Sequence, residues 1–326
     1  MKLGVIGAGA FGTALAQLAA AGGHETLLWG RDSATVRSIN ERRENAAYLP
    51  GLPLSASLRA TDRLEELADC DCWLLVTPAQ AMRSVLETAP RGDRALILCS
   101  KGIEASTGLF MSQVAEELAP GSPLGILTGP GFAEEIAAGL PTAVTFASAD
   151  AALYDAFRER LSAPSFRLYH TDDVIGAQVG GAVKNVLAIG CGAVEGRKLG
   201  QSARAALIAR GFAEMSRFAQ AYGGRRETLA GLCGLGDLVL TCTSADSRNF
   251  SLGLGLGQGR SAAELMEGRH GIVEGAFTAP VVARLARERG VDMPIVDAVH
   301  ALIAGESSVD QVLDALLSRP PRAEGV

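Results

Sequence analysis

The sequence predicts an α/β protein in which a doubly wound parallel sheet over residues 1–173 is followed by an all-helical region over residues 174–326. Two observations predict this division. Short apolar runs alternate with segments of helical period up to about residue 170, and strands separated by helices form parallel sheets. Beyond that point only segments of helical period remain, punctuated by Gly and Pro. The length of 326 residues also suits two domains better than one.

The strands of the first region are expected at nearly continuous apolar runs, as in a parallel sheet covered on both faces. In chain order they are Leu3–Ile6, Thr26–Trp29, 72–76, Ala95–Leu98, 124–127 and Thr142–Ala147. Helices are expected at residues 11–21 and at about 33–43, after the first two strands.

The second region is expected to be a series of helices, each marked by apolar residues at helical spacing. They are 176–194, 203–222, 229–242, 261–267, 279–289, 294–303 and Val309–Leu317. The first is apolar enough to resemble a membrane span. Gln178, Lys184, Asn185 and several glycines interrupt it, so membrane insertion is not expected.

Composition narrows the function classes. The net charge of −6 and the 5% of aromatic residues argue against a nucleic-acid partner. The six cysteines are scattered, which predicts reduced, mostly buried thiols and a cytoplasmic location. The histidines His24, His170, His270 and His300 have no ligand spacing, and no metal site is expected.

A glycine-rich segment, Gly7-Ala8-Gly9-Ala10-Phe11-Gly12, lies between the first predicted strand and the first predicted helix. In this context the glycines permit a tight turn, close approach of a pyrophosphate to the backbone, and packing of the helix on the strand. The first N–H groups of the helix then face the anion. The segment predicts a Rossmann domain that binds NADP or NAD.

The second strand ends in Trp29-Gly30-Arg31-Asp32, at the position that distinguishes the two cofactors. An acidic residue here binds the ribose hydroxyl of NAD, and an arginine accommodates the 2′-phosphate of NADP. Because Arg31 comes first, the pattern favours NADP, with NAD as the alternative. In the other interpretation Arg31 is a solvated loop charge and Asp32 caps the next helix.

Two further segments follow predicted strands: Ser100-Lys101-Gly102 and Gly129-Pro130-Gly131-Phe132-Ala133. Ligands of open α/β sheets lie beyond the carboxyl ends of the strands. Lys101 and the second segment are therefore expected to line the ligand site. Ordinary surface loops are the alternative.

Lys184 is the main candidate for proton transfer. Together with Asn185 it supplies the only strongly polar side chains between Gly180 and Gly192. An ammonium in apolar surroundings has a lowered pKa unless it is paired, which suits a general acid or base. In the alternative, its aliphatic stem covers apolar surface while the ammonium reaches water.

Other polar groups in the second region have two interpretations each. Asp237 either contributes to a site or caps a helix. The segment Ser247-Arg248-Asn249 either binds phosphate, for which a guanidinium is well suited, or forms a solvated loop. Arg210 and Glu214 are expected to pair on one helix.

In combination the motifs resemble the bacterial NAD(P)-dependent sn-glycerol-3-phosphate dehydrogenases, from Val5 to about Ile295. The matching strings are GAGAFGTALA, LLWGRD, NAAYLPG, SKGIE, GPGFAEEIAAGLPTA, GGAVKNVLAIG, ARAALIARGFAEM, GLGDLVLTC, SRN, LGQG and VEG. GGAVKN, GLGDLVLTC and SRN are far more specific than the glycine fingerprint.

The resemblance implies reduction of dihydroxyacetone phosphate to sn-glycerol 3-phosphate for phospholipid synthesis, with Lys184 as general acid/base. A homodimer is compatible with it. The implied cofactor-binding residues are Gly7, Gly9, Ala10, Phe11, Gly12, Arg31, Lys101, Ala133, Arg248, Ile272 and Glu274. The implied substrate-binding residues are Lys101, Gly129, Gly131, Lys184, Asp237, Ser247, Arg248 and Asn249.

The sequence departs from this family at a few positions. Ala10 and Phe11 stand where a hydroxylic residue and Tyr or Trp are usual, and Gly131 replaces Ser or Thr. Gln201 and Ser202 replace an acidic residue and Asn. These changes are expected to lower affinity more than activity.

Two competing interpretations make different predictions. A helical-domain dehydrogenase for a hydroxy acid or sugar acid would recognise a carboxylate, which Ser247-Arg248-Asn249 and the Asp237 segment argue against. A nucleotide-sensing module would keep the glycine fingerprint and need no polar group at Lys184.

Overall fold

The computed structural model describes residues 2–161, 163–267 and 271–320, and its contacts divide the chain into two compact units. The first unit holds the residues up to Ser100 together with Leu109–Val174. The second holds Lys101–Gly108 and the residues from Ile175 onward. The short segment that begins at Lys101 therefore packs with the helical unit, although the strands on either side of it belong to the first.

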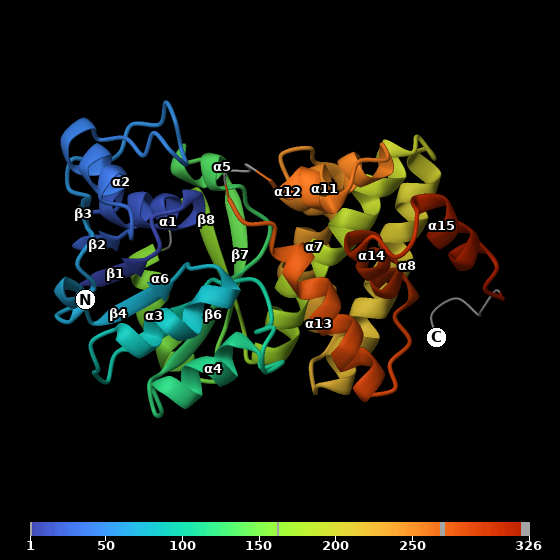
Figure 1. Ribbon diagram of the computed structural model, residues 1–326. Coiled ribbons are helices and arrows are strands. Elements are labelled where there is room, and N and C mark those ends of the chain that lie inside the picture. Colours follow the sequence, from blue (N-terminus) through green and yellow to red (C-terminus); the bar gives the residue numbers. More distant parts are fainter. Residues whose placement is uncertain (1, 162, 268–270, 321–326) are drawn as a thin grey trace. The chain divides into compact units, whose positions relative to one another are not determined.

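The first unit is built on an eight-stranded sheet with the order β3-β2-β1-β4-β5-β6-β7-β8 (Figure 1). The strands are β1 (Leu3–Ile6), β2 (Thr26–Trp29), β3 (Arg59–Thr61), β4 (Cys72–Leu75), β5 (Ala95–Leu98), β6 (Leu124–Thr128), β7 (Thr142–Ala147) and β8 (Phe166–Thr171). The predicted α/β class is confirmed. The central strands β1 and β4 are buried along their whole length, as a parallel sheet covered on both faces requires.

One strand pair corrects the expectation of a wholly parallel sheet, because β7 runs antiparallel to β6. The helix between them, α5 (Ala133–Ala137), has only five residues and spans about 7.5 Å. That is too short to return the chain to the far edge of the sheet, as a parallel crossover must. The strands β3 and β8 were not predicted, since β3 has three residues and β8 exposes alternate side chains.

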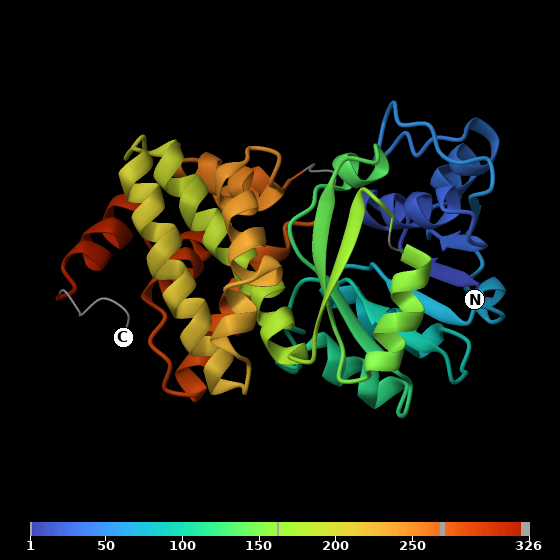
Figure 2. The same ribbon diagram turned by 180° about the vertical axis from the view of Figure 1, so that it is seen from behind.

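Helices cover both faces of this sheet. The others in this unit are α1 (Ala10–Ala21), α2 (Ser33–Arg37), α3 (Met82–Thr88), α4 (Met111–Leu118) and α6 (Ala151–Leu161), with short helical turns η1 (Ser38–Arg42), η2 (Leu64–Leu67) and η3 (Ala79–Ala81). Helices α3 and α4 contact each other on the face seen in Figure 1. Helix α6, which contacts α1, lies on the opposite face, seen in Figure 2.

The second unit is helical, as expected. Its elements are α7 (Val174–Gly196), α8 (Gln201–Ala221), α9 (Arg226–Leu229), η4 (Leu232–Gly236), α10 (Asp237–Thr243), α11 (Arg248–Gly257), α12 (Ala262–Met266), α13 (Glu274–Glu288), α14 (Pro294–Ala304) and α15 (Val309–Leu317). The single helix expected at 229–242 is wrong: α9, a π-helical turn and α10 take its place. Gly234 allows this break, because a Cβ there would lie 2.0 Å from the carbonyl oxygen of Leu229.

Helix α7 is the core of this unit, and every residue from Gly176 to Val194 is buried. Glycines bring α11 close to it: a Cβ at Gly192 would lie 2.0 Å from the Phe250 oxygen, and one at Gly253 1.9 Å from the Ile189 oxygen. Among the described residues α7 is the one helix long and apolar enough to cross a membrane, and its most apolar stretch is 89% buried by protein. Burial by neighbouring helices accounts for its apolar composition.

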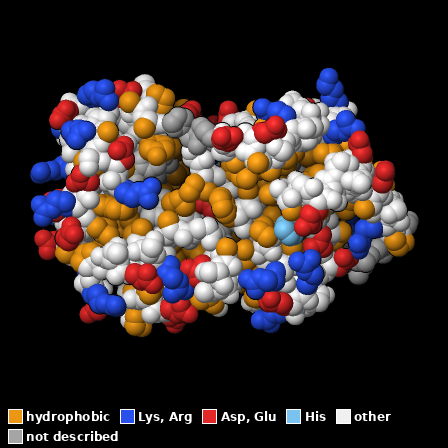
Figure 3. Space-filling view, in the orientation of Figure 1, with side chains coloured by type: hydrophobic (Ala, Val, Ile, Leu, Met, Phe, Trp, Pro, Cys, Tyr) orange, Lys and Arg blue, Asp and Glu red, His pale blue; other side chains and the backbone are white. Residues whose placement is uncertain are grey.

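The predicted pair between Arg210 and Glu214 is wrong. The carboxylate of Glu214 accepts hydrogen bonds from the backbone N–H groups of Ile295 (2.8 Å) and Val296 (3.2 Å), so it caps the start of α14. Glu214 is buried while Arg210, on the same helix, is exposed. On the face drawn in Figure 3, basic and acidic side chains are interspersed over the surface of each unit.

Candidate functional site

The glycine loop between β1 and α1 has the geometry of an anion cradle. A Cβ at Gly7 (φ 123°) would lie 2.7 Å from the carbonyl oxygen of Val76, and one at Gly12 only 1.9 Å from the oxygen of Gly7. Gly9, in contrast, has no atom within 4 Å of the place where a Cβ would stand. The two outer glycines therefore close the turn, and the middle one leaves space beside the backbone.

This space fits a dinucleotide pyrophosphate. Gly9 is the N-cap of α1, and no side chain caps that helix. The backbone N–H groups of its first turn and the positive end of its dipole therefore face the region beside Gly9. Ala10 and Phe11 form the start of the helix. Their side chains carry no hydrogen-bonding group, so the backbone must supply the donors.

At the end of β2 the structure separates the roles of Arg31 and Asp32. Asp32 caps α2: its carboxylate accepts the N–H groups of Ala34 (3.2 Å) and Thr35 (3.0 Å) and the Thr35 hydroxyl (2.6 Å). These hydrogen bonds, that of the Thr35 side chain foremost, lower the pKa of Asp32. Arg31 is exposed beside it. The carboxylate of Asp32 thus already has partners within the protein, while the Arg31 side chain lies at the surface.

The segment after β6 also follows the carboxyl end of a strand. Gly129 has φ 148°, and a Cβ there would lie 2.9 Å from the backbone of Val144. At Gly131 a Cβ would come within 3.1 Å of Ile136 and Thr142, and Ala133 is the first residue of α5. The packing thus favours small residues at Gly129 and Gly131.

The ammonium of Lys184 is buried inside the second unit and does not reach water along its stem. Its Nζ donates to Oδ1 of Asp237 and to the Thr241 hydroxyl, both at 2.8 Å. Burial lowers the pKa of Lys184 to about 8, although the Asp237 carboxylate opposes the shift. Lys184 therefore carries a proton that can leave near neutral pH.

Asp237 binds two ammonium groups at once. Its Oδ2 accepts from Nζ of Lys101 at 2.7 Å, and its Oδ1 accepts from Lys184. Burial alone would raise the pKa of this carboxyl, but the two ammoniums outweigh burial and lower it. Asp237 is the first residue of α10 and not its N-cap, which is Gly236. The cluster brings the ammoniums of Lys101 and Lys184 to the single carboxylate of Asp237, and two neighbouring ammoniums favour an anionic ligand.

Sequence reasoning missed Thr241 at this cluster. Its hydroxyl accepts from Lys184 and lies 3.3 Å from Oδ1 of Asp237, one turn earlier on α10. The residue is 4% exposed. In the sequence it is one threonine within an apolar helical run. Only its hydrogen bond to Lys184, 57 positions earlier, shows that it belongs to the cluster.

The segment Ser247-Arg248-Asn249 begins α11. Ser247 is the N-cap and accepts from the N–H of Phe250 (3.2 Å), and Arg248 is the exposed first residue of the helix. Asn249 is buried: its Oδ1 accepts from the N–H of Gly275 and its Nδ2 donates to Oδ1 of Asn185, each at 2.9 Å. The segment is therefore not a solvated loop, although the Arg248 side chain is exposed.

Asn249 thereby joins three helices. Gly275 lies in the first turn of α13, and Asn185 follows Lys184 on α7. The first residue of α13 is Glu274, which is half-buried, and Ile272 just before it is 40% exposed. The starts of α11 and α13 are thus tied to the helix that carries Lys184.

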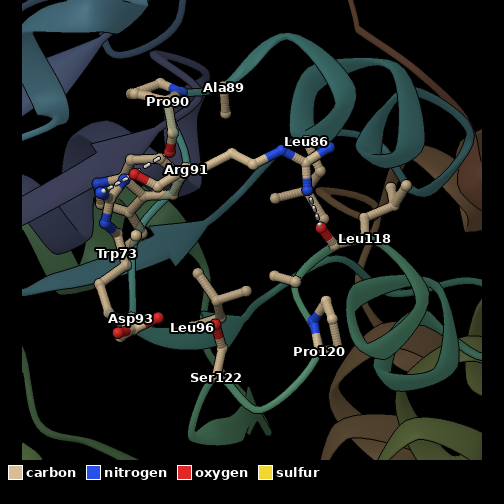
Figure 4. Close-up of a pocket in the computed structure, with 13 residues that line it drawn as sticks. Trp73, Leu86, Ala89, Pro90, Arg91, Asp93, Leu96, Leu118, Pro120 and Ser122 are labelled. Atoms are coloured by element: carbon tan, nitrogen blue, oxygen red, sulfur yellow. Dashed lines mark hydrogen bonds between the residues drawn. The ribbon is translucent and has the colours of Figure 1, made fainter.

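One hollow in the first unit lies away from the glycine loop, at the opposite edge of the sheet. It measures about 180 Å³ and is lined by the loops before β5 and β6 (Figure 4). The Arg94 guanidinium lies 4.0 Å from the centre of the Trp73 ring and donates to the carbonyl oxygens of Pro90 and Arg91. Because these loops precede their strands, the hollow is not part of the candidate cofactor site.

Other groups considered in the sequence do not add to a site. Over residues 2–161, 163–267 and 271–320 no cluster of His, Cys, Asp or Glu could hold a metal ion. All six cysteines lie within the described residues and are buried, and none of them forms a disulfide. Of the four histidines, His24, His170 and His300 lie in separate parts of the fold, and His270 lies outside the described residues.

Comparison with known proteins identifies the family. Models of the NAD-dependent glycerol-3-phosphate dehydrogenase N-terminus and C-terminus match residues 2–154 and 173–314. The chain belongs to the NAD-dependent glycerol-3-phosphate dehydrogenase family. It is 56% identical to glycerol-3-phosphate dehydrogenase [NAD(P)+] 1 of Sphingopyxis alaskensis, over 99% of this chain and 98% of the relative. Glycerol-3-phosphate dehydrogenase [NAD(P)+] of Caulobacter vibrioides is 51% identical, over 99% of this chain and 98% of the relative.

Solved structures of this family share the fold. The crystal structure of glycerol-3-phosphate dehydrogenase from Coxiella burnetii superposes with a TM-score of 0.93 at 36% identity, covering 98% of this chain and 99% of that one. D-mandelate dehydrogenase, at 16% identity and a TM-score of 0.65, shares the fold alone. The chain is thus an oxidoreductase of the CH–OH class that uses NAD or NADP, as the glycine loop indicated.

Proposed function

We propose that this chain reduces dihydroxyacetone phosphate to sn-glycerol 3-phosphate with NADPH or NADH, and that Lys184 is the proton donor. The observation that carries the proposal is the buried ammonium of Lys184, held 2.8 Å from Asp237 and beside a second ammonium, Lys101. The names of the relatives, glycerol-3-phosphate dehydrogenase [NAD(P)+], support the substrate.

The protonation of Lys184 follows from its environment. With a pKa of about 8 it is mostly protonated at neutral pH yet gives up its proton more easily than an exposed lysine does. Asp237 and Thr241 fix Nζ in one place, so no reorganisation is needed when negative charge develops on a carbonyl oxygen. The reduced nicotinamide, when bound, supplies the hydride.

The second ammonium adds to this stabilisation. Lys101 is held by the other oxygen of Asp237, so the two ammoniums share one carboxylate. Two neighbouring ammoniums favour a developing oxyanion or the substrate's phosphate. We assign Lys101 to substrate binding on this basis, and Gly129 and Gly131 because they follow the carboxyl end of β6.

Phosphate binding is assigned to Ser247, Arg248 and Asn249. The guanidinium of Arg248 is exposed at the first turn of α11, where the helix dipole also favours an anion. Asn249 uses one N–H of its amide on Asn185, and the second can donate to a phosphate oxygen.

Cofactor binding is assigned to the glycine loop with Ala10 and Phe11, and to Arg31, Lys101, Ala133, Arg248, Ile272 and Glu274. Residues 1–173 then form the dinucleotide-binding domain and residues 174–326 the substrate and catalytic domain. NADP is preferred over NAD, since Asp32 uses both carboxylate oxygens to cap α2 while Arg31 is exposed.

The cellular role proposed with this activity is the supply of sn-glycerol 3-phosphate for phospholipid synthesis in the cytoplasm, by a protein that is not inserted in a membrane. The oligomeric form proposed is a homodimer. Light scattering on the purified protein checks the oligomer, and fractionation of the producing cells checks the location.

The activity is tested by following absorbance of NADPH, and separately of NADH, with dihydroxyacetone phosphate and with a 2-oxo acid as control. Turnover with the triose phosphate alone, and faster with NADPH, is the expected result. Turnover with the 2-oxo acid would favour a hydroxy-acid dehydrogenase. Cofactor binding without turnover of either would overturn the proposed reaction.

A further inference from the structure

A buried amide side chain, that of Asn45, joins the glycine loop to the helix that follows it. Asn45 is 0% exposed and lies just after Arg43, which has a left-handed backbone (φ 55°). Its Nδ2 donates to the carbonyl oxygen of Ala8 at 2.9 Å and to the hydroxyl of Thr13 at 2.8 Å. Its Oδ1 accepts from the N–H of Tyr48 at 3.3 Å.

The orientation of this amide is determined by its partners. The carbonyl oxygen of Ala8 can only accept, so the nitrogen of Asn45 must face it. The N–H of Tyr48 can only donate, so the oxygen must face that side. Both N–H groups of Asn45 are thereby used. Neither a carboxylate nor an aliphatic side chain of the same size makes the same set of bonds.

The two groups that Asn45 holds stand on either side of the anion cradle. Ala8 is the central residue of Gly7-Ala8-Gly9, and Thr13 lies in the first turns of α1 and is fully buried. One amide therefore sets the distance between the turn and the helix start. It reaches them from 37 and 32 residues away.

Ala8 also contacts the end of β2. A Cβ at Gly30 would lie 2.6 Å from Cβ of Ala8, so the two backbones meet closely just before Arg31. The residue whose carbonyl Asn45 holds is thus the one against which the Arg31 segment packs. A displaced Ala8 would disturb the pyrophosphate cradle.

The loop depends on this support because it has no polar side chains. Residues 7–12 are glycine, alanine and phenylalanine, so a pyrophosphate there is bound by backbone N–H groups. Backbone donors cannot adjust as side-chain rotamers do, and sub-ångström misplacement of a binding group is costly.

We propose that Asn45 is a positioning residue for the cofactor: it sets the geometry of the glycine loop so that the backbone N–H groups converge on the pyrophosphate. The proposal rests on the cofactor part of the proposed function and not on its substrate. It therefore makes a prediction about cofactor binding in the absence of any substrate.

The test uses the full-length protein and two substitutions. Asn45→Asp keeps the size but places an oxygen against the Ala8 carbonyl, and Thr13→Val removes the hydroxyl acceptor while leaving the Ala8 bond. We expect the Kd for NADPH, measured by its fluorescence, to rise about tenfold or more for Asn45→Asp and by a smaller factor for Thr13→Val. Thr13→Ser, which keeps the hydroxyl, should bind as the wild type does.

Adenosine 2′-monophosphate, which has no pyrophosphate, separates positioning from general loosening. Its Kd, from competition with NADPH, should change much less than the Kd for NADPH. Steady-state rates should show a raised KM for NADPH with kcat preserved at saturation.

Gln17→Ala is the matched control. Gln17 on α1 accepts the N–H of Ser55 at 2.7 Å and ties the same two segments together away from the glycine loop. This variant should lower the melting temperature without changing the Kd for NADPH.

The proposal would be overturned if Asn45→Asp weakened the binding of NADPH and of adenosine 2′-monophosphate equally, or if Gln17→Ala weakened NADPH binding to the same extent. Either result would show that Asn45 has a structural role only. A folded Asn45→Asp protein that binds NADPH within twofold of the wild type would also overturn the proposal. If Asn45→Asp does not fold, Thr13→Val against Thr13→Ser decides. A wild type that binds NADPH but does not reduce dihydroxyacetone phosphate would contradict the proposed reaction. The Kd values would still decide the role of Asn45.

Discussion

The candidate site of the first unit is formed by backbone groups, and that of the second unit by side chains. In the first, the glycine loop has no polar side chain, and its capacity to bind an anion lies in the backbone beside Gly9. In the second, the capacity lies in side chains: the buried Lys184, Asp237 and Thr241, and the partly buried Lys101. A backbone site should be damaged by adding atoms and a side-chain site by removing them.

Removing the ammonium of Lys184 should have the largest effect. Lys184→Ala is expected to lower kcat about a thousandfold or more, because both proton donation and charge stabilisation are lost. The Kd for NADPH in the absence of substrate should stay within about twofold. Stopped-flow or steady-state rates with dihydroxyacetone phosphate measure the first, and fluorescence titration the second.

The control is the exposed Lys198→Asn, whose left-handed backbone (φ 56°) asparagine tolerates. It should keep full activity. Near-normal turnover by Lys184→Ala would refute the assignment of the proton donor.

Asp237→Asn should lower kcat by about a hundredfold and also move the pH profile. Burial lowers the pKa of Lys184 to about 8, and the Asp237 carboxylate opposes that shift. Reduction of the ketone requires the protonated form of Lys184 as proton donor, so the wild-type rate should fall as pH rises through about 8. Without the carboxylate the fall should come at lower pH. An unchanged midpoint would mean that another group donates the proton.

Two glycine substitutions test the backbone site by adding one carbon each. Gly9→Ala meets no atom within 4 Å, so the melting temperature should be kept while the Kd for NADPH rises about tenfold or more. Gly12→Ala would put Cβ 1.9 Å from the oxygen of Gly7 and should destabilise the fold by about 1–3 kcal/mol. Thermal unfolding measures the loss of stability and NADPH titration the loss of binding, so together they distinguish the two variants. Unaltered NADPH binding by Gly9→Ala would show that the space beside Gly9 is not the cofactor's.

Features that depend on residues close together in the sequence could be predicted, and features that depend on distant residues could not. The strands β1, β2, β4 and β5 and the glycine loop are local patterns, and the structure has them where the pattern placed them. The strand β7 was predicted with its correct bounds, but its antiparallel direction was missed, because direction depends on the length of α5, which periodicity does not give. Lys184 stood out because a charge in an apolar helix has to be explained.

The partners of polar residues such as Lys184 lie far away in the sequence, and the sequence did not identify them. Asp237 could equally have been a helix cap, and Thr241 carried no signal. Asp32 caps α2, as the alternative interpretation had it, and the sequence alone did not decide between that role and a place in the cofactor site. Glu214 was misassigned because the i,i+4 rule considers only neighbours on one helix, and its partners lie 81 and 82 residues away.

Glu214 is a buried ionisable residue of the second unit that lies outside the cluster around Lys184. Burial raises the pKa of Glu214 to about 7, although the N–H groups of Ile295 and Val296 and the charge of Arg217 oppose the shift. The folded protein thus holds this proton more tightly than the unfolded chain. Its stabilising contribution is complete below about pH 4.5, and it is lost as pH rises through about 7.

Glu214→Gln keeps an acceptor for the start of α14 but cannot ionise. Between pH 5 and pH 8 the wild type should lose up to about 3 kcal/mol more unfolding free energy than the variant. Urea unfolding at both pH values measures this difference, and kcat should be unchanged because Glu214 touches none of the cluster residues. An identical pH dependence in both proteins would show that Glu214 is ionised in the fold, with Arg217 and the α14 dipole sufficient to hold its charge. A loss of kcat instead would mean that the start of α14 contributes to the site, and that buried charges in this unit cannot be divided into structural and catalytic sets by contact alone.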